Sequence, residues 1–132
     1  MIVIDASALV AVLLPHGPIT TATRDRLRLD PHWIAPDHLT VEVLSAIRGH
    51  RLGGRITEAA ALDALLALGT MDIDQRPAAP LVSRIWELKD NLSSYDAAYV
   101  ALAEAEGCTL VTADARIAAA PGTRCPIEVI SA

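Results

Sequence analysis

The chain has 132 residues, of which 52% are hydrophobic and only 3% aromatic, and its formal net charge is −5 at pH 7. A chain of this length can bury about two-thirds of its unfolded surface, so we expect a single domain over residues 1–132. The acidic balance argues against unassisted binding of polyanions, which would need a local basic patch and a bridging metal. No apolar run approaches the roughly 18 residues of a membrane span, and no basic region precedes the apolar start, so we expect a cytoplasmic protein.

Short β-branched runs alternate with helix-like segments along the chain. In chain order we predict a strand at 1–4, helices at 7–14 and 19–29, a strand at 33–35, helices at 38–51 and 59–68, a strand at 71–74, a helix at 80–89, a helix from Ser93 or Ser94 to Glu106, a strand at 110–111, a helix at 115–120 and a strand at 127–130. Strands separated by helices favour a parallel sheet with right-handed crossovers. We therefore predict an α/β fold whose central sheet is covered on both faces.

Several helix boundaries carry their own signals. Asp37 and Thr57 could each cap the helix that follows, because a side-chain oxygen at that position accepts an orphan backbone N–H. Three residues are predicted to end helices, because proline cannot continue one and glycine favours the position after one. They are Pro15, Gly69 and Gly107.

Four acidic residues lie among apolar neighbours. Asp5 and Asp114 each close a strand-like run, and Glu42 and Asp96 fall within helix-like runs. Ligands of a parallel sheet collect at the carboxyl ends of its strands, where Asp5 and Asp114 should lie. Acids that converge in an apolar setting repel one another and lose solvation. A hard divalent metal bound by oxygen ligands is the simplest resolution.

Each acid also has a purely structural explanation. Asp5 could cap the helix at 7–14, and Asp114 could cap the helix at 115–120. Asp96 would interact favourably with the dipole of its helix, and Glu42 could be solvated on an exposed face. Taken singly, the structural explanation is preferred for every one of them. The site hypothesis therefore depends on the four acids together.

The order of these acids and the residues around them resemble the PIN-domain ribonucleases, in particular the small VapC-type toxins of toxin–antitoxin pairs. The matching segments are IVIDASALVAVLL, Pro36 with HLTVEVLSAIR, LSSYDAAYVALAEAEG and TLVTADARIA, which together span nearly the whole chain. The resemblance implies a PIN-like three-layer α/β/α domain and an endoribonuclease that binds Mg²⁺ or Mn²⁺ through the four acids. It also implies a cognate VapB-like antitoxin that blocks the site, and a homodimer.

The resemblance gives each acid an expected role. Asp5 and Asp96 would be the main metal ligands, Asp114 would complete the ligand set directly or through water, and Glu42 would orient or deprotonate the attacking water. No acid follows Asp114 directly, which leaves a second firmly bound metal without support. Three residues are expected to hold the acids in place through hydrogen bonds. They are Ser7, Asn91 and Thr112.

The remaining polar and aromatic residues are either ambiguous or not expected at the metal site. Arg48, Arg51 and Arg55 form a basic stretch that is either a solvated helix face or a contact for RNA phosphates. Tyr95 and Tyr99 are expected in the core or an interface. The four histidines lack ligand spacing and are expected on the surface.

The low aromatic content and the many apolar helices leave little polar covering for a small monomer. We therefore expect a symmetric homodimer. The helices at 59–68 and 80–89 are the expected interface, with Trp86 as an anchor.

Three other classes of protein fit parts of the pattern. A phosphoacceptor receiver domain would need adjacent acids near its first strand and a late lysine, but the last lysine is Lys89. A phosphatase with an aspartyl nucleophile would need a second Asp where Ser7 stands. A non-catalytic binding module would be expected to lack one of the four acids, and none is missing. A measurement of metal-dependent ribonuclease activity would distinguish the PIN-domain hypothesis from all three of these classes.

Overall fold

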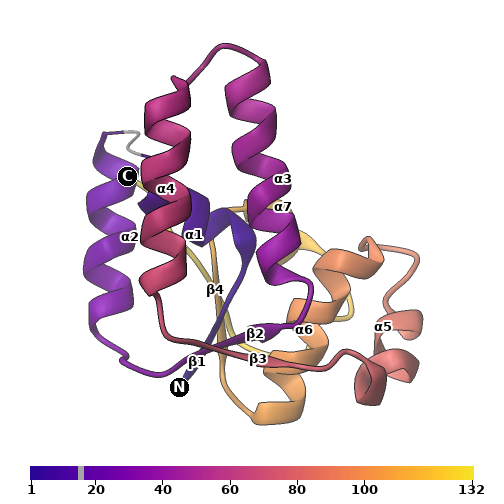
Figure 1. Cartoon of the computed structure of the whole chain (residues 1–132). Helices are drawn as coiled ribbons and strands as arrows, with labels where there is room; N and C mark the ends of the chain where they lie inside the picture. The colour runs from indigo at the N-terminus through magenta and orange to yellow at the C-terminus, as the bar shows by residue number, and fades with distance from the viewer. Residues whose placement is uncertain (15–16) are drawn as a thin grey trace.

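The computed structural model describes residues 1–14 and 17–132. Within these residues, five strands alternate with seven α-helices and one 3₁₀ helix, η1 (Figure 1). In chain order they are β1 (Ile2–Ile4), α1 (Ala6–Leu13), α2 (Pro18–Arg28), β2 (Trp33–Pro36), α3 (Leu39–Leu52), α4 (Glu58–Thr70), β3 (Ile73–Arg76), η1 (Ala79–Leu81), α5 (Val82–Glu87), α6 (Ser94–Glu106), β4 (Thr109–Thr112), α7 (Ala115–Ala119) and β5 (Ile127–Val129). The predicted strand–helix alternation is confirmed.

All five strands are parallel and lie in the order β3-β2-β1-β4-β5, which places β1 at the centre of the sheet. Figure 1 shows α1 to α4 gathered on one side of the sheet, with α5 and α6 on the other. The predicted three-layer α/β/α architecture is therefore confirmed. The strand order changes direction between β1 and β4, and α/β sheets place their ligand crevice at such a switch point.

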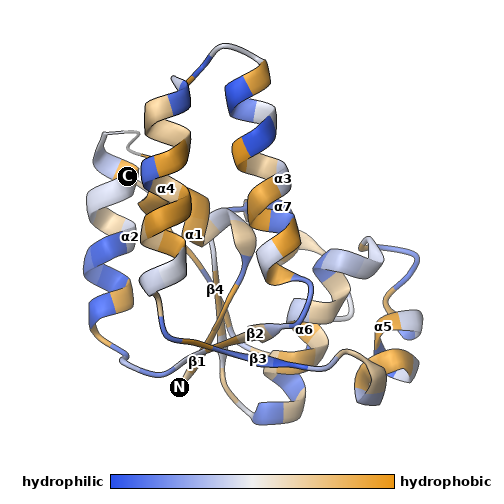
Figure 2. Ribbon diagram, viewed as in Figure 1, coloured by the Kyte–Doolittle hydropathy of each residue, from blue (hydrophilic) through white to orange (hydrophobic). Residues whose placement is uncertain are grey.

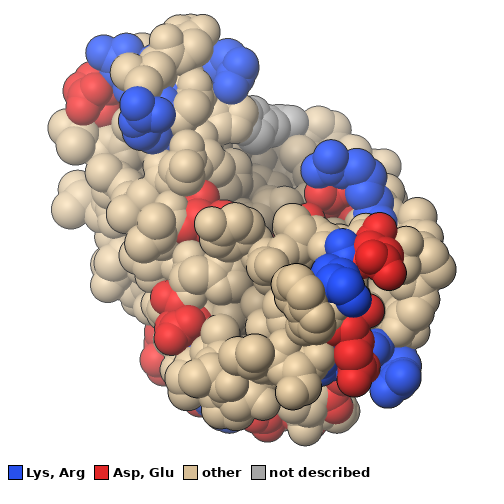
Figure 3. All heavy atoms as spheres, turned by 90° about the vertical axis from the view of Figure 1, so that its right-hand side faces the viewer, with Lys and Arg blue, Asp and Glu red and all other residues tan. Residues whose placement is uncertain are grey.

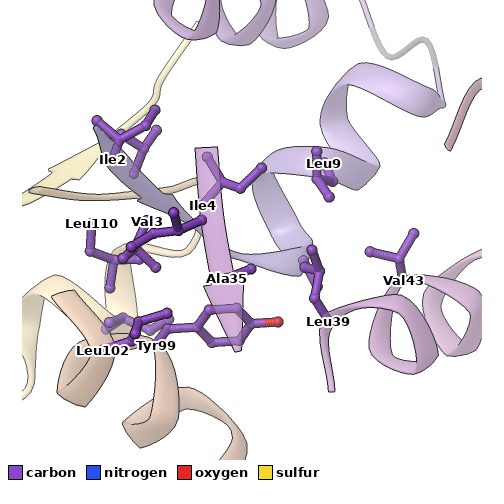
Figure 4. Packing of buried hydrophobic residues seen from close by; sticks show 14 of the residues in the cluster. Ile2, Val3, Ile4, Leu9, Ala35, Leu39, Val43, Tyr99, Leu102 and Leu110 are labelled. Atoms are coloured by element: carbon purple, nitrogen blue, oxygen red, sulfur yellow. The ribbon is translucent and has the colours of Figure 1, made fainter. Parts of the chain in front are cut away.

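The core lies on both faces of β1, and this explains the uninterrupted apolar run at the start of the chain. All three residues of Ile2–Ile4 are buried, as is typical of a parallel strand covered on both sides. In Figure 4, Tyr99 of α6 lies alongside Val3 and Ala35, while Leu9 of α1 packs near the central strand. Because Tyr99 is fully buried, its expected place in the core is confirmed.

The predicted cap at Asp37 is wrong. The backbone N–H of Asp37 donates to the carbonyl of Arg76 at 2.9 Å, which extends the pairing of β2 with β3 by one residue. The chain then turns at Asp37 and His38, and α3 begins only at Leu39. His38 takes the cap position and makes no side-chain capping bond.

The other boundaries are mixed. Thr57 caps α4 as predicted, and Gly107 ends α6 in the left-handed conformation at φ +65°. Gly69, however, does not end α4, which continues to Thr70. The hydroxyl of Thr70 donates to the carbonyl of Ala67 at 2.7 Å and so satisfies one of the last carbonyls without a glycine cap. Pro15 and His16 lie outside the described residues.

Two elements before α6 differ from the prediction in extent. The third strand is β3, two residues later than predicted, and it pairs only with β2 at the edge of the sheet. The predicted helix at 80–89 is a short 3₁₀ helix followed by a short α5. The N–H groups of Leu88 and Lys89 bond to carbonyls three residues back, which tightens the turn and stops the helix.

Among the described residues, no single helix is both long and apolar enough to cross a membrane.

Candidate active site

The four acids line one pocket of about 350 Å³. Asp5 directly follows β1, Asp114 lies two residues after β4, and Glu42 and Asp96 lie in the first turns of α3 and α6. The carboxyl ends of the two central strands and the starts of two helices therefore bring together acids that are far apart in the sequence.

Asp5 is buried, and both of its carboxylate oxygens accept hydrogen bonds. Oδ1 accepts from the Ser7 hydroxyl at 2.7 Å and from the N–H of Ala8 at 3.0 Å, and the second of these bonds caps α1. Oδ2 accepts from the hydroxyl of Thr112. Burial raises the pKa of Asp5 in spite of these donors, because desolvation outweighs them. Asp5 therefore caps a helix and lines the pocket at the same time.

The hydroxyls of Ser7 and Thr112 connect the two strand ends. They lie 3.1 Å apart, and the Ser7 hydroxyl also accepts the N–H of Ala113 at 2.9 Å. The Thr112 hydroxyl accepts the N–H of Asp114 at 2.9 Å. One pair of hydroxyls thus fixes the Asp5 side chain and the backbone that presents Asp114.

Glu42 lies between two aromatic residues. The buried Tyr99 hydroxyl donates to Oε1 at 3.1 Å, and Nε2 of His38 lies 3.7 Å from Oε2. Burial is the main cause that raises the pKa of Glu42, and the charges of Asp96 and Asp5 raise it further. Burial lowers the pKa of His38, which disfavours the charged imidazole that an ion pair with Glu42 would need.

Asp96 and Asp114 differ in their electrostatics. Burial raises the pKa of Asp96, and the nearby charge of Asp114 adds to the effect. Asp114 caps α7 through the N–H of Arg116, and its two oxygens accept bonds of 3.0 and 2.8 Å from the Arg116 guanidinium. This pairing holds the pKa of Asp114 below its ordinary value.

The donor set of the pocket fits a hard divalent cation, because it consists of carboxylate oxygens and three of the four acids have raised pKa values. A bound cation would offset both the repulsion and the lost hydration. In the part of the chain that the structure describes, no three His, Cys, Asp or Glu side chains are grouped closely enough to hold an ion as they stand. Direct binding of one ion by three of these side chains would therefore require them to move closer together.

Comparison with known proteins identifies the family. A family model for the PIN domain matches residues 2–122. Ribonuclease VapC9 of Mycobacterium tuberculosis is 40% identical over 131 residues, which cover 98% of each chain. Ribonuclease VapC1 of the same organism is 39% identical over 129 residues, which cover 97% of this chain and 96% of that protein. The chain belongs to the VapC ribonucleases of the PIN-domain family.

Solved structures share the fold. VapC20 of Mycobacterium tuberculosis, described as a toxin that cleaves the sarcin-ricin loop, gives a TM-score of 0.67 at 20% identity, covering 90% of this chain and 94% of that one. VapBC2 of Rickettsia felis, bound to a DNA fragment of its promoter, gives 0.71 at 14% identity over 99% and 100% of the two chains. The PIN-like architecture is confirmed, and the receiver-domain and phosphatase alternatives are excluded by the family.

The remaining residues predicted for this PIN-domain site lie outside the pocket. Asn91 is exposed, and its side chain contacts the carbonyl of Pro121 at 3.5 Å rather than any of the four acids. The three arginines are exposed at the end of α3 and in the turn to α4, at the top of Figure 1. Arg51 bonds Glu58 at 2.8 Å, and Arg55 donates to His50. Figure 3 shows basic side chains at this tip, with acidic side chains in the hollow below it.

Three residues that contact the acids were missed in the sequence. His38 and Tyr99 contact Glu42, and Arg116 pairs with Asp114. The contact of His38 was predictable from helical spacing, because His38 lies four residues before Glu42 and residues at that spacing share one helix face. Arg116 lies two residues after the acid that caps its helix. Tyr99 contacts Glu42 only through the tertiary fold, so local spacing could not reveal it.

Proposed function

We propose that this PIN-domain protein is a metal-dependent endoribonuclease toxin that cleaves RNA phosphodiester bonds in the cytoplasm. The observation that carries the proposal is the convergence of Asp5, Glu42, Asp96 and Asp114 on one pocket at the switch point of the sheet. The names of the ribonuclease relatives support the substrate class. The test is cleavage of total RNA by the purified protein in Mg²⁺ or Mn²⁺ and in excess EDTA. Equal cleavage in both conditions would contradict the proposal.

In this proposal Asp5, Asp96 and Asp114 hold Mg²⁺ or Mn²⁺. A bound divalent metal supplies a more acidic water and neutralises charge on the phosphoryl oxygens. The chain contributes the rest. The hydroxyls of Ser7 and Thr112 orient Asp5, and Glu42, with its raised pKa and its bond from Tyr99, is placed to accept a proton from the attacking water.

Metal should stabilise the fold, and more so at neutral pH than in mild acid. The pKa values of Asp5, Glu42 and Asp96 are raised, so the metal-free protein loses free energy of unfolding as pH rises through these values. The pKa of Asp114 is lowered, so its charge stabilises the fold, and this contribution to the free energy of unfolding is lost only as pH falls through that pKa. At a metal concentration 100 times the dissociation constant, we expect a gain of about 2.7 kcal/mol, or roughly 10 °C in melting temperature.

A thermal-shift titration at pH 5 and pH 7.5 measures this effect. Sodium chloride at matched ionic strength is the control, because salt alone also screens repulsion between carboxylates. No shift at pH 7.5 up to millimolar Mg²⁺ or Mn²⁺, or a shift no larger than that in sodium chloride, would count against the metal site.

The same proposal includes a VapB-like antitoxin. The acidic pocket and the net charge of −5 are complementary to a basic inhibitory segment. The exposed Arg48, Arg51 and Arg55 are proposed to contact RNA phosphates. Glu42 and Arg51 are nine residues apart on one helix, so their Cα atoms lie about 13 Å apart along its axis.

We also propose that the single domain assembles as a homodimer. Figure 2 shows hydrophobic residues along much of α4, where Leu62 and Leu66 are exposed. On α5, Val82 and Trp86 are exposed as well, and Lys89 lies over the Trp86 ring at 5.2 Å. Light scattering at micromolar concentration should give twice the 14.0 kDa chain mass, and Leu66→Glu should shift the protein toward monomer. A parent protein that is monomeric under these conditions would contradict the dimer.

A further inference from the structure

A second pocket opens beside the acidic one and shares Glu42 with it. It measures about 340 Å³, and its walls come from α3 and from the start of α6. The α3 wall is one stripe of the helix, because its residues follow the i, i+3, i+4, i+7 spacing of a single face. They are His38, Val41, Glu42 and Ser45, and Tyr95 of α6 forms the opposite wall.

Tyr95 presents an open aromatic surface in this pocket. Its side chain is 65% exposed, although it directly precedes the acid Asp96. The centroid of the Tyr95 ring lies 5.7 Å from that of His38, and the two ring planes are tilted by 58°. The Tyr95 hydroxyl has no hydrogen-bond partner among the described residues. Of the two places expected for Tyr95, the core is therefore wrong and an interface stays a prediction, and the exposed ring is available to a ligand.

The other walls favour a flat, largely apolar ligand. Val41 is 69% exposed and contributes apolar surface to the pocket. Ser45 offers a hydroxyl that has no partner within the described part of the chain and can donate or accept. Neither Lys nor Arg lines the pocket, and Glu42 places a carboxylate at its inner end. A phosphate group would find no cation here, whereas an uncharged base with polar edges fits the lining.

We propose that this pocket is a nucleobase subsite, in which an unpaired RNA base next to the cleaved phosphodiester stacks on the ring of Tyr95. The inference rests on the proposed ribonuclease function, because the shared Glu42 connects the subsite to the reacting phosphate. Stacking on an aromatic side chain requires a base that is free of its helix, so the pocket selects single-stranded RNA. Every base has a π face, so the selection tolerates different sequences.

The test compares Tyr95→Ala with Tyr95→Phe on a single-stranded RNA oligonucleotide that the parent cleaves. Tyr95→Ala should lower kcat/KM by between about fivefold and a hundredfold, mostly through KM, because stacking contributes to binding. Tyr95→Phe keeps the ring and should stay close to the parent. Leu29→Ala, at a side chain that is 79% exposed on α2 and lines neither pocket, is the surface control.

An abasic scan identifies the base that uses the pocket. One oligonucleotide of a series, with a base removed next to the cleavage point, should be cut poorly by the parent. Removing the same base should reduce cleavage by Tyr95→Ala only slightly, because this variant already lacks the ring on which the base would stack. Equal penalties in both proteins would overturn the subsite, as would a Tyr95→Ala variant that matches the parent on every oligonucleotide.

Two further outcomes distinguish failure of the base subsite from failure of the ribonuclease proposal. A parent that cleaves no RNA in Mg²⁺ or Mn²⁺ would overturn the ribonuclease proposal and the subsite with it. If Tyr95→Ala cleaves like the parent but resists inhibition by the antitoxin, the pocket binds a protein partner instead, and only the subsite is overturned.

Discussion

Replacing Asp96 with asparagine should reduce RNA cleavage by orders of magnitude and leave the fold intact. Asparagine keeps the shape and one oxygen of the side chain but removes a charged ligand, and a bound metal contributes both water activation and charge neutralisation. The pKa of Asp96 is raised by burial and by Asp114, so the ionised side chain opposes folding in the metal-free protein. The melting temperature of metal-free Asp96→Asn at neutral pH should therefore equal or exceed that of the parent.

Cleavage of total RNA by purified variant and parent measures the first effect, and circular dichroism measures the second. Asp90→Asn is the matched control, because Asp90 is exposed in the turn before α6 and lines neither pocket. Expression of Asp96→Asn in cells should be tolerated where the parent arrests growth. An Asp96→Asn protein that cleaves as well as the parent would show that the proposed mechanism is wrong.

Thr112→Val should lower activity by removing hydrogen bonds that position the acids, while all four acids remain. The change keeps the side-chain shape but removes the donor to Asp5 and the acceptor for the Asp114 N–H. Because Thr112 is fully buried, these groups lose their partners away from water, at an expected cost of about 1–3 kcal/mol of unfolding free energy. Loss of the groups that orient metal ligands should lower cleavage roughly 10- to 100-fold.

The pH dependence distinguishes this effect from simple destabilisation. The Thr112 hydrogen bond lowers the pKa of Asp5, so its loss should raise that pKa further and shift the pH profile of cleavage to higher pH. Thr109→Val at the other end of β4 is the control, with an expected stability change within about 0.5 kcal/mol. Thr112→Ser restores the hydroxyl and should recover most of the activity. A Thr112→Val profile that coincides with the parent's would contradict the role given to this hydroxyl.

The buried strands were predictable from sequence, and so was β5 at one edge of the sheet, but the position of β3 at the other edge was not. β1 is an uninterrupted apolar run, and β4 has the apolar pair Leu110 and Val111 between two threonines, so the sequence shows both strands directly. β3 lies at the edge, where Asp74 and Gln75 are exposed and the strand is held by its pairing with β2. Asp37 was misread for a related reason. Its backbone continues that pairing, and backbone bonds between distant strands leave no trace in the local sequence.

The acids of the candidate site were predictable because each follows a strand or starts a helix, and a parallel fold brings such positions together. The hydrogen-bond and ion-pair partners of these acids were not predictable. Whether Asp114 is free or paired depends on the rotamer of the exposed Arg116, and Glu42 meets Tyr99 only after α3 and α6 have packed. Charge and position along the chain therefore predicted which residues converge. The protonation balance within the pocket depends on burial and on neighbours that the order of residues does not reveal.

The separation of the acids along the chain determines when the protein can act during its own synthesis. Asp5 is made well before its supporting hydroxyl and the last acid, which belong to β4 and the residues just after it. A nascent chain that has not yet paired β4 with β1 has neither a closed pocket nor an oriented Asp5. A copy of this chain that stops before β4 would therefore lack the complete acidic site. The complete pocket would form only once β4 and Asp114 have emerged and β4 has paired with β1.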